Sequence, residues 1–339
     1  MIGALRFSLA ILVVFNHLWL PTANKVGAHA VAAFYIISGF LMAKVIQETY
    51  GLSLAGGARF VLNRLLRLFP LYWAVLGVSV VLLFVFPGTF GSTYSNMKVP
   101  DSAWHWWQNL FLLDLASSPQ VVAPPAWSLS VELFFYGAMV LLLARSKWIS
   151  LAWLVASLSY TVYLIAIGAT FSQRYTPVTA ASLFFATGAC LYFFGRNWRP
   201  PVGLGLALLP LFLAFPLIVE AAGGDRLMLG FYGPAILFVI IFTALLPYRN
   251  EKLKGIDAKL GDLAYPVFLI HFMAAGIIET ALTFLPSYRT TWFVFATALT
   301  ILLSVGWVRL EHRWLTPLRN DVRSSPHGTV PTTMVRADV

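Results

Sequence analysis

The stretch ALRFSLAILVVFNHLWL, residues 4–20, is an apolar run of the length that crosses a membrane as a helix. Two ionisable residues, Arg6 and His17, interrupt it. Eleven residues at about 100° each bring the two side chains to nearly the same helix face, about 16 Å apart along the axis. Because an ionisable group near the bilayer centre costs at least ~2.5 kcal/mol, the pair predicts a functional site that faces the protein interior.

The composition of the chain predicts the same class of protein. Of its 339 residues, 59% are hydrophobic and 11% are charged, whereas a soluble domain has about 25% charged residues. Nine further apolar segments follow the first, so we expect an all-α integral membrane protein with about ten transmembrane helices, multi-pass in the cell membrane. These nine segments are roughly residues 28–46, 71–86, 126–143, 149–169, 178–194, 202–219, 227–246, 263–284 and 292–310.

The basic residues predict the orientation of these segments. If the N-terminus is cytoplasmic, then 18 of the 23 Lys and Arg residues fall on the cytoplasmic side, and an even number of spans returns the C-terminus to that side. The net charge of +10 is therefore the charge bias of a membrane topology. Membrane lipids are the expected surroundings, and no basic run outside these flanks indicates a nucleic-acid partner.

The chain divides into one membrane domain, residues 1–319, and a tail, residues 320–339. The tail is rich in Ser, Thr, Pro and charge without periodicity, so we expect it to be disordered in the cytoplasm. The run WHWWQNLFLL at 104–113 is typical of an interfacial helix whose indole rings lie among lipid headgroups. Cys190 is the single cysteine, which leaves no intramolecular disulfide or cysteine-based metal cluster, and no metal is expected.

Five blocks carry a resemblance to a known family. They are Arg6 and His17 in the order R-x10-H, FYIISGF at 34–40, NRLLRLFPLYW at 63–73, AWSLSVELFFY at 126–136 and LGDLAYPVFLIH at 260–271. In this order they resemble the signature blocks of the acyltransferase-3 family, integral-membrane enzymes that move acyl groups from acyl-CoA to hydroxyls, often on cell-surface glycans. Asn63 stands where the family often has Arg, and Ala264 and Phe268 replace a frequent Ser and Tyr.

The resemblance implies a reaction and its participants. Acyl-CoA, most simply acetyl-CoA, would be a co-substrate, with no cofactor bound permanently. The acceptor would be a hydroxyl of a surface glycan or of a lipid-linked sugar. His17 would be the general base or the acyl carrier, with Arg6 and Glu132 as further catalytic residues. Arg64 and Arg67 would bind the phosphates of coenzyme A, and the substrate cavity would include Ser38, Trp127, Ser128, Tyr265 and His271.

Helix geometry is consistent with this chemistry. His17 lies about three residues from the outer end of the first span, and Glu132 lies about two turns into the fourth span from the same side. The two side chains can therefore share a depth, where a carboxylate could hold the tautomer of an imidazole that takes a proton. Arg64 and Arg67 are three residues apart and share a helix face within residues 59–70.

Other readings of the same residues stay open. A proton-coupled transporter or glycan-export protein would also place His, Arg and Glu in a membrane interior, although no half-chain repeat is visible. An acyltransferase for a lipid or macrolide-like acceptor would differ only in its cavity. Arg6 could extend to the inner headgroups, and Arg64 and Arg67 could serve only the orientation of the chain.

Overall fold

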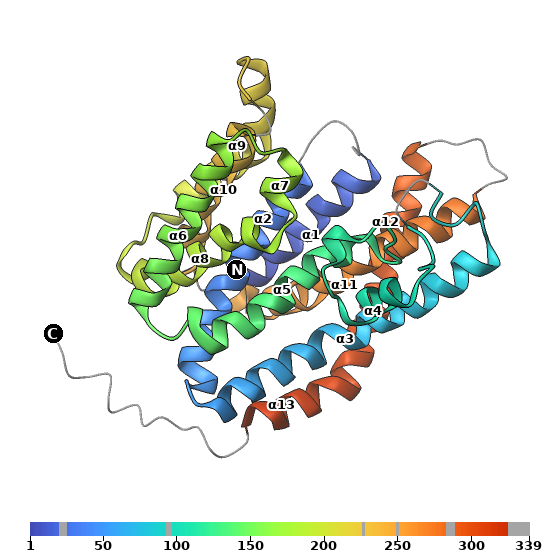
Figure 1. Cartoon of the computed structure of the whole chain (residues 1–339), viewed down its shortest axis with the longest axis horizontal. Helices are drawn as coiled ribbons and strands as arrows, with labels where there is room; N and C mark the ends of the chain where they lie inside the picture. The colour runs from blue at the N-terminus through green and yellow to red at the C-terminus, as the bar shows by residue number, and fades with distance from the viewer. Residues whose placement is uncertain (20–25, 93–96, 226–227, 249–250, 283–288, 325–339) are drawn as a thin grey trace.

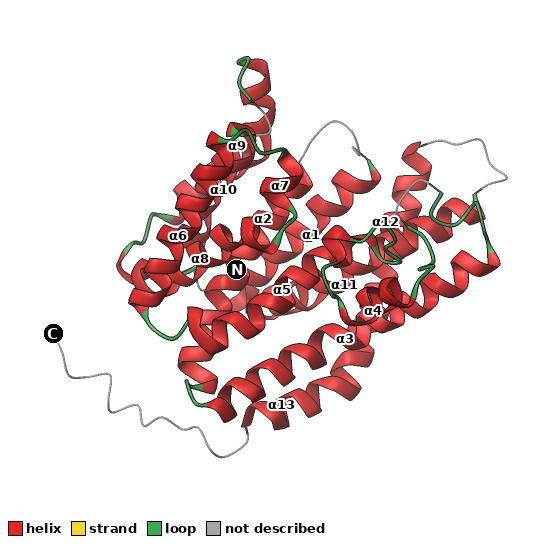
Figure 2. Ribbon diagram, viewed as in Figure 1, coloured by secondary structure: helices red, strands yellow, loops and turns green. Residues whose placement is uncertain are grey.

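The computed structural model describes residues 1–19, 26–92, 97–225, 228–248, 251–282 and 289–324, and over these residues it contains helices and no strand (Figure 2). The helices are α1 (Ile2–Leu18), α2 (Val26–Val45), α3 (Leu54–Val85), α4 (Ala103–Phe111), α5 (Trp127–Ala138), α6 (Lys147–Ala166), α7 (Phe171–Tyr175), α8 (Val178–Phe194), α9 (Val202–Ala221), α10 (Leu229–Leu245), α11 (Glu251–Ala281), α12 (Arg289–Leu310) and α13 (Thr316–Ser324). Turns of π-helix extend α2, α5 and α12.

The all-helical membrane architecture expected from the sequence is confirmed. Within the described residues, eight helices are long and apolar enough to cross a membrane, and α1 and α10 are shorter apolar helices of 17 residues each. Each of the ten predicted segments overlaps one of these ten helices. The chain is therefore a multi-pass helical membrane protein, and the count of ten spans and the cytoplasmic termini stay predictions.

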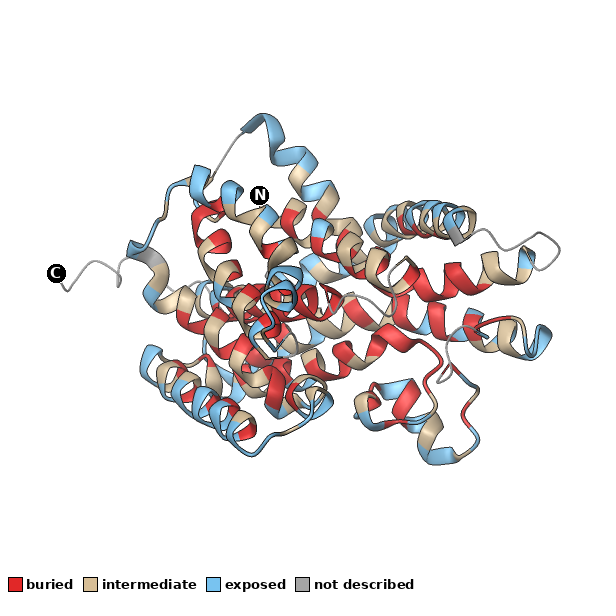
Figure 3. Ribbon diagram, turned by 90° about the horizontal axis from the view of Figure 1, so that it is seen from above, coloured by how far each residue is buried: buried red, intermediate tan, exposed pale blue. Residues whose placement is uncertain are grey.

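Buried residues gather in the middle of the bundle (Figure 3). Helix α2 and the part of α11 from Gly261 to Gly276 hold many of them. Helix α2 packs closely on α8, because glycines let the two backbones approach. A Cβ atom on Gly39 would collide with the carbonyl of Phe185, and one on Gly188 would collide with the carbonyl of Ile36. Small residues at such contacts are how helices associate where lipid removes the hydrophobic drive.

Helix α1 packs along α11, and this contact brings Arg6 and His17 against the last signature block (Figure 1). Gly3 and Gly261 lie against each other at one end of the contact. There Asp257 caps α1, with carboxylate oxygens 3.3 and 2.8 Å from the backbone nitrogens of Gly3 and Ala4. Two N–H groups that have no partner inside the helix are thereby satisfied, and the start of α1 is tied to α11.

Two boundaries differ from the sequence prediction. The stretch 59–70 is continuous with the third span, because α3 is one helix of 32 residues, about 48 Å long, with Pro70 inside it. The tail was expected to be disordered from residue 320, but α13 continues to Ser324 and lies beside α3 (Figure 1). The rest of the predicted tail, residues 325–339, lies outside the described residues.

The tryptophan-rich run forms a helix, as predicted. Helix α4 begins at the cap Ser102, exposes Trp104 and Trp107 by 60% and 55%, and buries Gln108 and Asn109. Side chains of α3 bind its last turn, since Trp73 donates to the carbonyl of Leu110 at 2.9 Å. The exposed indole rings fit a membrane interface, which remains a prediction for this helix.

Candidate active site

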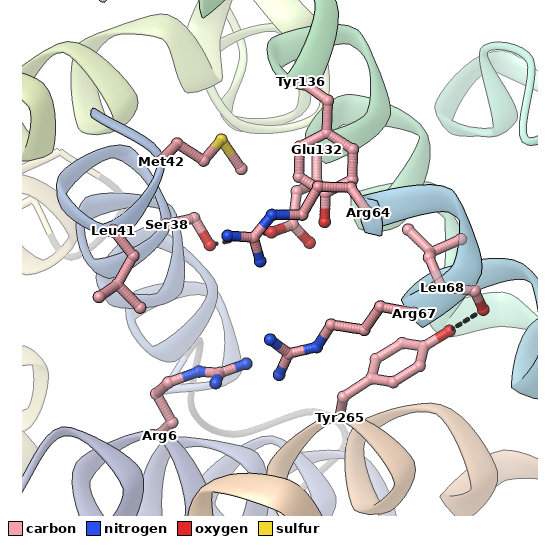
Figure 4. Close-up of a pocket in the computed structure, with 10 residues that line it drawn as sticks. All are labelled: Arg6, Ser38, Leu41, Met42, Arg64, Arg67, Leu68, Glu132, Tyr136 and Tyr265. Atoms are coloured by element: carbon pink, nitrogen blue, oxygen red, sulfur yellow. Dashed lines mark hydrogen bonds between the residues drawn. The ribbon is translucent and has the colours of Figure 1, made fainter. Parts of the chain in front are cut away.

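Three arginines and one glutamate from three helices line a single cavity inside the bundle (Figure 4). Arg6 comes from α1, Arg64 and Arg67 from consecutive turns of α3, and Glu132 from α5. Ser38, Leu41, Met42, Leu68, Tyr136 and Tyr265 complete the lining. The cavity volume is about 50 Å³, which exceeds the 10–15 Å³ that one water molecule requires. The structure therefore brings together two groups that the sequence placed apart, Arg6 and the α3 arginines.

The charges around this cavity are unbalanced. No acidic group of the described residues lies within 4.0 Å of the Arg6, Arg64 or Arg67 guanidinium, and Glu132 is the one carboxylate in the lining. The Arg64 guanidinium lies over the rings of Phe60 and Tyr136, 5.2 and 6.0 Å from their centroids. Because half-buried cations without counter-ions are costly, the cavity is suited to bind an anion.

Glu132 and Tyr265 are held by neighbouring helices. Ser38 on α2 donates a hydrogen bond of 3.0 Å to the Glu132 carboxylate. Tyr265 on α11 donates to the backbone carbonyl of Leu68 on α3 at 2.7 Å, as Figure 4 shows. These two bonds connect α2 with α5 and α11 with α3 around the cavity, so its walls are fixed by hydrogen bonds as well as by packing.

A second cavity of about 60 Å³ continues from the first, since both are lined by Arg6, Ser38, Glu132 and Tyr265. Its remaining lining is mostly apolar: Val31, Phe34, Tyr35, Ser128, Leu129, Ala264 and Phe268. The charged end is therefore followed by a more apolar space that reaches Phe268, which lies one helical turn before His271 on α11. The shared lining joins the two cavities into one path from the arginines to Phe268, and neither His17 nor His271 lines it.

His17 has a different partner from the one that its depth suggested. Its Nδ1 lies 2.9 Å from Nε2 of His271, whose own Nδ1 lies 2.6 Å from the backbone carbonyl of Phe268. The proposed direct contact between His17 and Glu132 is wrong in this structure, because the Glu132 carboxylate binds Ser38 and faces the arginines. Sequence reasoning placed His271 only as a cavity residue and did not predict the pair.

Some of the remaining predicted cavity residues line a cavity and others do not. Ser38, Ser128 and Tyr265 line one or both of these cavities, and their contact with substrate stays a prediction. Trp127 lines neither and packs instead against Tyr175 of α7, with ring centroids 5.0 Å apart. Its indole is therefore part of a contact between α5 and α7.

Asn63 replaces an arginine of the family pattern, and the structure shows what it does instead. Its side-chain amide donates to the backbone carbonyl of Arg319 on α13 at 2.7 Å. Arg319 in turn binds Glu311 through a contact of 2.6 Å. Helix α13 is thus attached to α3 one residue from Arg64. No local sequence pattern predicts this link between distant parts of the chain.

Together these features define a polytopic membrane protein with a cavity lined by three arginines and, at the contact of α1 and α11, a pair of histidines of which His271 is fully buried. The sequence profile of the family described as "Acyltransferase domain" matches residues 2–308, so the chain belongs to the acyltransferase-3 family and is a membrane-bound acyltransferase. It is similar to the exopolysaccharide production protein ExoZ of Rhizobium meliloti (strain 1021), with 26% identity over 272 residues that cover 76% of this chain and 79% of that protein. No solved structure matches the chain.

Proposed function

We propose that this enzyme transfers an acyl group, most simply acetyl, from acyl-CoA to a hydroxyl of an extracellular polysaccharide or its lipid-linked precursor. The observation that carries the proposal is the cavity in which Arg6, Arg64 and Arg67 meet with one carboxylate and no ion pair among the described residues. Guanidinium groups bind phosphate oxygens in a fork geometry, and coenzyme A presents several phosphates. The donor would supply the negative charge that the protein lacks there.

The path through the bundle suits a long donor. Arg6 and His17 lie on the one helix α1, eleven residues or about 16 Å apart along the axis. In coenzyme A the pantetheine arm separates the phosphates from the thioester, so phosphates held at the arginines would direct the acyl end toward His17. With the orientation predicted from the basic residues, the arginines face the cytoplasm, where acyl-CoA is available.

His17 would then act at the acceptor hydroxyl. As a general base, its free ring nitrogen takes the hydroxyl proton while the oxygen attacks the thioester carbonyl. The carbon–sulfur bond breaks, and the proton passes from His17 to the coenzyme A thiolate that leaves. If His17 instead carries the acyl group, the same nitrogen attacks the thioester first and the hydroxyl attacks the resulting acyl-imidazole. Both routes give an ester and free coenzyme A.

The similarity to a protein named for exopolysaccharide production supports a polysaccharide acceptor. A lipid or macrolide-like acceptor would use the same donor cavity and histidine and would differ on the acceptor side alone. A proton-coupled transporter would need no acyl donor, and the membership in an acyltransferase family argues against it.

The proposal is tested by transfer in a defined assay. The purified full chain is incubated with acyl-labelled acyl-CoA and cell-envelope polysaccharide, and both the free thiol and the labelled polysaccharide are measured. We expect His17→Gln to lose transfer at least ~10²-fold while it still binds acyl-CoA, because a general base is lost without a change in the donor cavity.

His105→Gln is the matched control, since His105 binds Asp101 at the start of α4 and lies outside both cavities. It should transfer at the wild-type rate. Near-native transfer by His17→Gln, or no thiol release with any polysaccharide, lipid-linked sugar or lipid fraction, would contradict the proposed reaction.

A further inference from the structure

Two imidazole rings meet where α1 packs on α11. His17 and His271 are joined at 2.9 Å between Nδ1 and Nε2, their ring planes differ by 4°, and their centroids lie 5.1 Å apart. Phe272 packs edge-on against both rings, with centroids at 4.9 and 4.7 Å. His271 is fully buried, so its two ring nitrogens depend on neighbouring protein groups for their hydrogen bonds.

The backbone decides which nitrogen of His271 carries the proton. The carbonyl of Phe268 can only accept a hydrogen bond, and it lies 2.6 Å from Nδ1 of His271, so this nitrogen is the donor. In the neutral ring Nε2 is then an acceptor. The alternative ring orientation would place carbon atoms at both positions and lose both bonds, so the hydrogen bonds select the orientation that the structure has.

The tautomer of His271 fixes the tautomer of His17. Because Nε2 of His271 accepts, Nδ1 of His17 must donate across the 2.9 Å contact. In a neutral His17 the lone pair is then on Nε2, and no described residue hydrogen-bonds to that atom. A protonated His271 would reverse this, since it would donate from both nitrogens and force the His17 proton onto Nε2. Burial among phenylalanine rings favours the neutral form of His271, because a charge there has no counter-ion among the described residues.

We propose that His271 is a positioning residue that holds His17 in the Nδ1–H tautomer, so that Nε2 faces the substrates as the reactive nitrogen. The tautomer of His17 follows from the two hydrogen bonds alone. That Nε2 is the reactive nitrogen rests on the proposed function. When Nε2 takes a proton, Nδ1–H still donates to the neutral His271 ring, and this hydrogen bond keeps His17 oriented, which is the orienting part of the role of the aspartate in a Ser-His-Asp triad. Here a neutral ring, anchored to a helix carbonyl, replaces the carboxylate that Glu132 was expected to supply.

The test compares two substitutions of His271 in the purified full chain. His271→Gln places an amide oxygen near the position of Nε2 and can still accept from His17, whereas His271→Leu cannot. The tautomer of His17 is read from the nitrogen NMR signals of ¹⁵N-histidine-labelled protein, assigned by comparison with His17→Gln. We expect the Nδ1–H tautomer in the wild type and in His271→Gln, and its loss in His271→Leu.

Kinetics give an independent readout. We expect His271→Leu to lower kcat roughly 10–100-fold, by analogy with the loss of activity when a metal-bound histidine loses its hydrogen-bond partner. The donor KM should stay within about twofold because His271 lines neither cavity. His271→Gln should recover most of the rate, which a purely structural role would not produce. His105→Gln again serves as the control for a histidine-to-glutamine change outside the site.

The outcomes separate this inference from the proposed function. A wild-type His17 with its proton on Nε2 overturns the inference, even if no His271 variant folds. So does a His17 tautomer that is unchanged in folded His271→Leu, or a folded His271→Gln that is as slow as His271→Leu. If the tautomer depends on His271 but His17→Gln still transfers acyl groups, the positioning stands and the proposed role of His17 fails.

Discussion

Arg67→Ala tests whether the arginine cavity holds the donor. Arg67 is half-buried in the cavity wall, and its guanidinium points toward that of Arg6 across the space (Figure 4). Since no described carboxylate pairs with Arg67, the substitution breaks no ion pair within the protein. The substitution should therefore weaken the binding of acyl-CoA, because one hydrogen bond to a charged phosphate contributes about 1.5–3 kcal/mol to the binding free energy. This corresponds to a donor Kd that rises about 10–150-fold.

The assay is equilibrium binding of acyl-CoA to the purified variant, followed by steady-state KM for donor and acceptor. Arg67→Lys should lose less, because it keeps the charge and loses only the fork geometry. Arg64→Ala together with Arg67→Ala should cost a different amount from the two single costs combined, because both groups face one small cavity.

Lys254→Ala is the matched control, a basic residue on the same predicted side whose side chain is 77% exposed in a pair with Glu251. It should bind the donor as the wild type does. The reasoning is refuted if Arg67→Ala binds acyl-CoA with unchanged affinity, or if it raises the acceptor KM as much as the donor KM. Unchanged affinity with a reduced amount of protein in the membrane would assign Arg67 to orientation alone.

Two further predictions concern the fold. Gly188→Ala should destabilise the bundle by about 1–3 kcal/mol, because the new Cβ meets the backbone carbonyl of Ile36. Thermal unfolding in detergent measures this loss. Gly203→Ala, whose Cβ meets nothing within 4 Å, is the control that should not be destabilised. A topology reporter fused after Val339 and another inserted near Arg249 should both read cytoplasmic, as the distribution of basic residues predicts. An external reading at either position contradicts the ten-span topology, and equal unfolding temperatures for the two glycine variants contradict the close contact of α2 and α8.

The site itself was only partly predictable. Arg6 and His17 on one helix face, and Arg64 with Arg67 on another, follow from helical periodicity, and the structure keeps both pairs on continuous helices. The partner of His17 did not follow. Depth in the membrane allowed Glu132, yet depth alone does not say which helices touch, and α1 packs along α11, not along α5. His271 could have been suspected, because it too is an ionisable residue in an apolar span.

By itself, the sequence of this protein determined its class and its elements. Hydropathy and the alternation of basic residues are local properties of the chain, and in a membrane every backbone polar group must be satisfied within its own helix, so ten apolar segments become ten helices. The tertiary structure alone decided which of these helices meet. The meeting of Arg6 with Arg64 and Arg67, the turn of Glu132 toward Ser38 and the pairing of His17 with His271 depend on glycine contacts and crossings between helices distant in sequence. Such contacts are set by the packing of whole surfaces, which no single segment encodes.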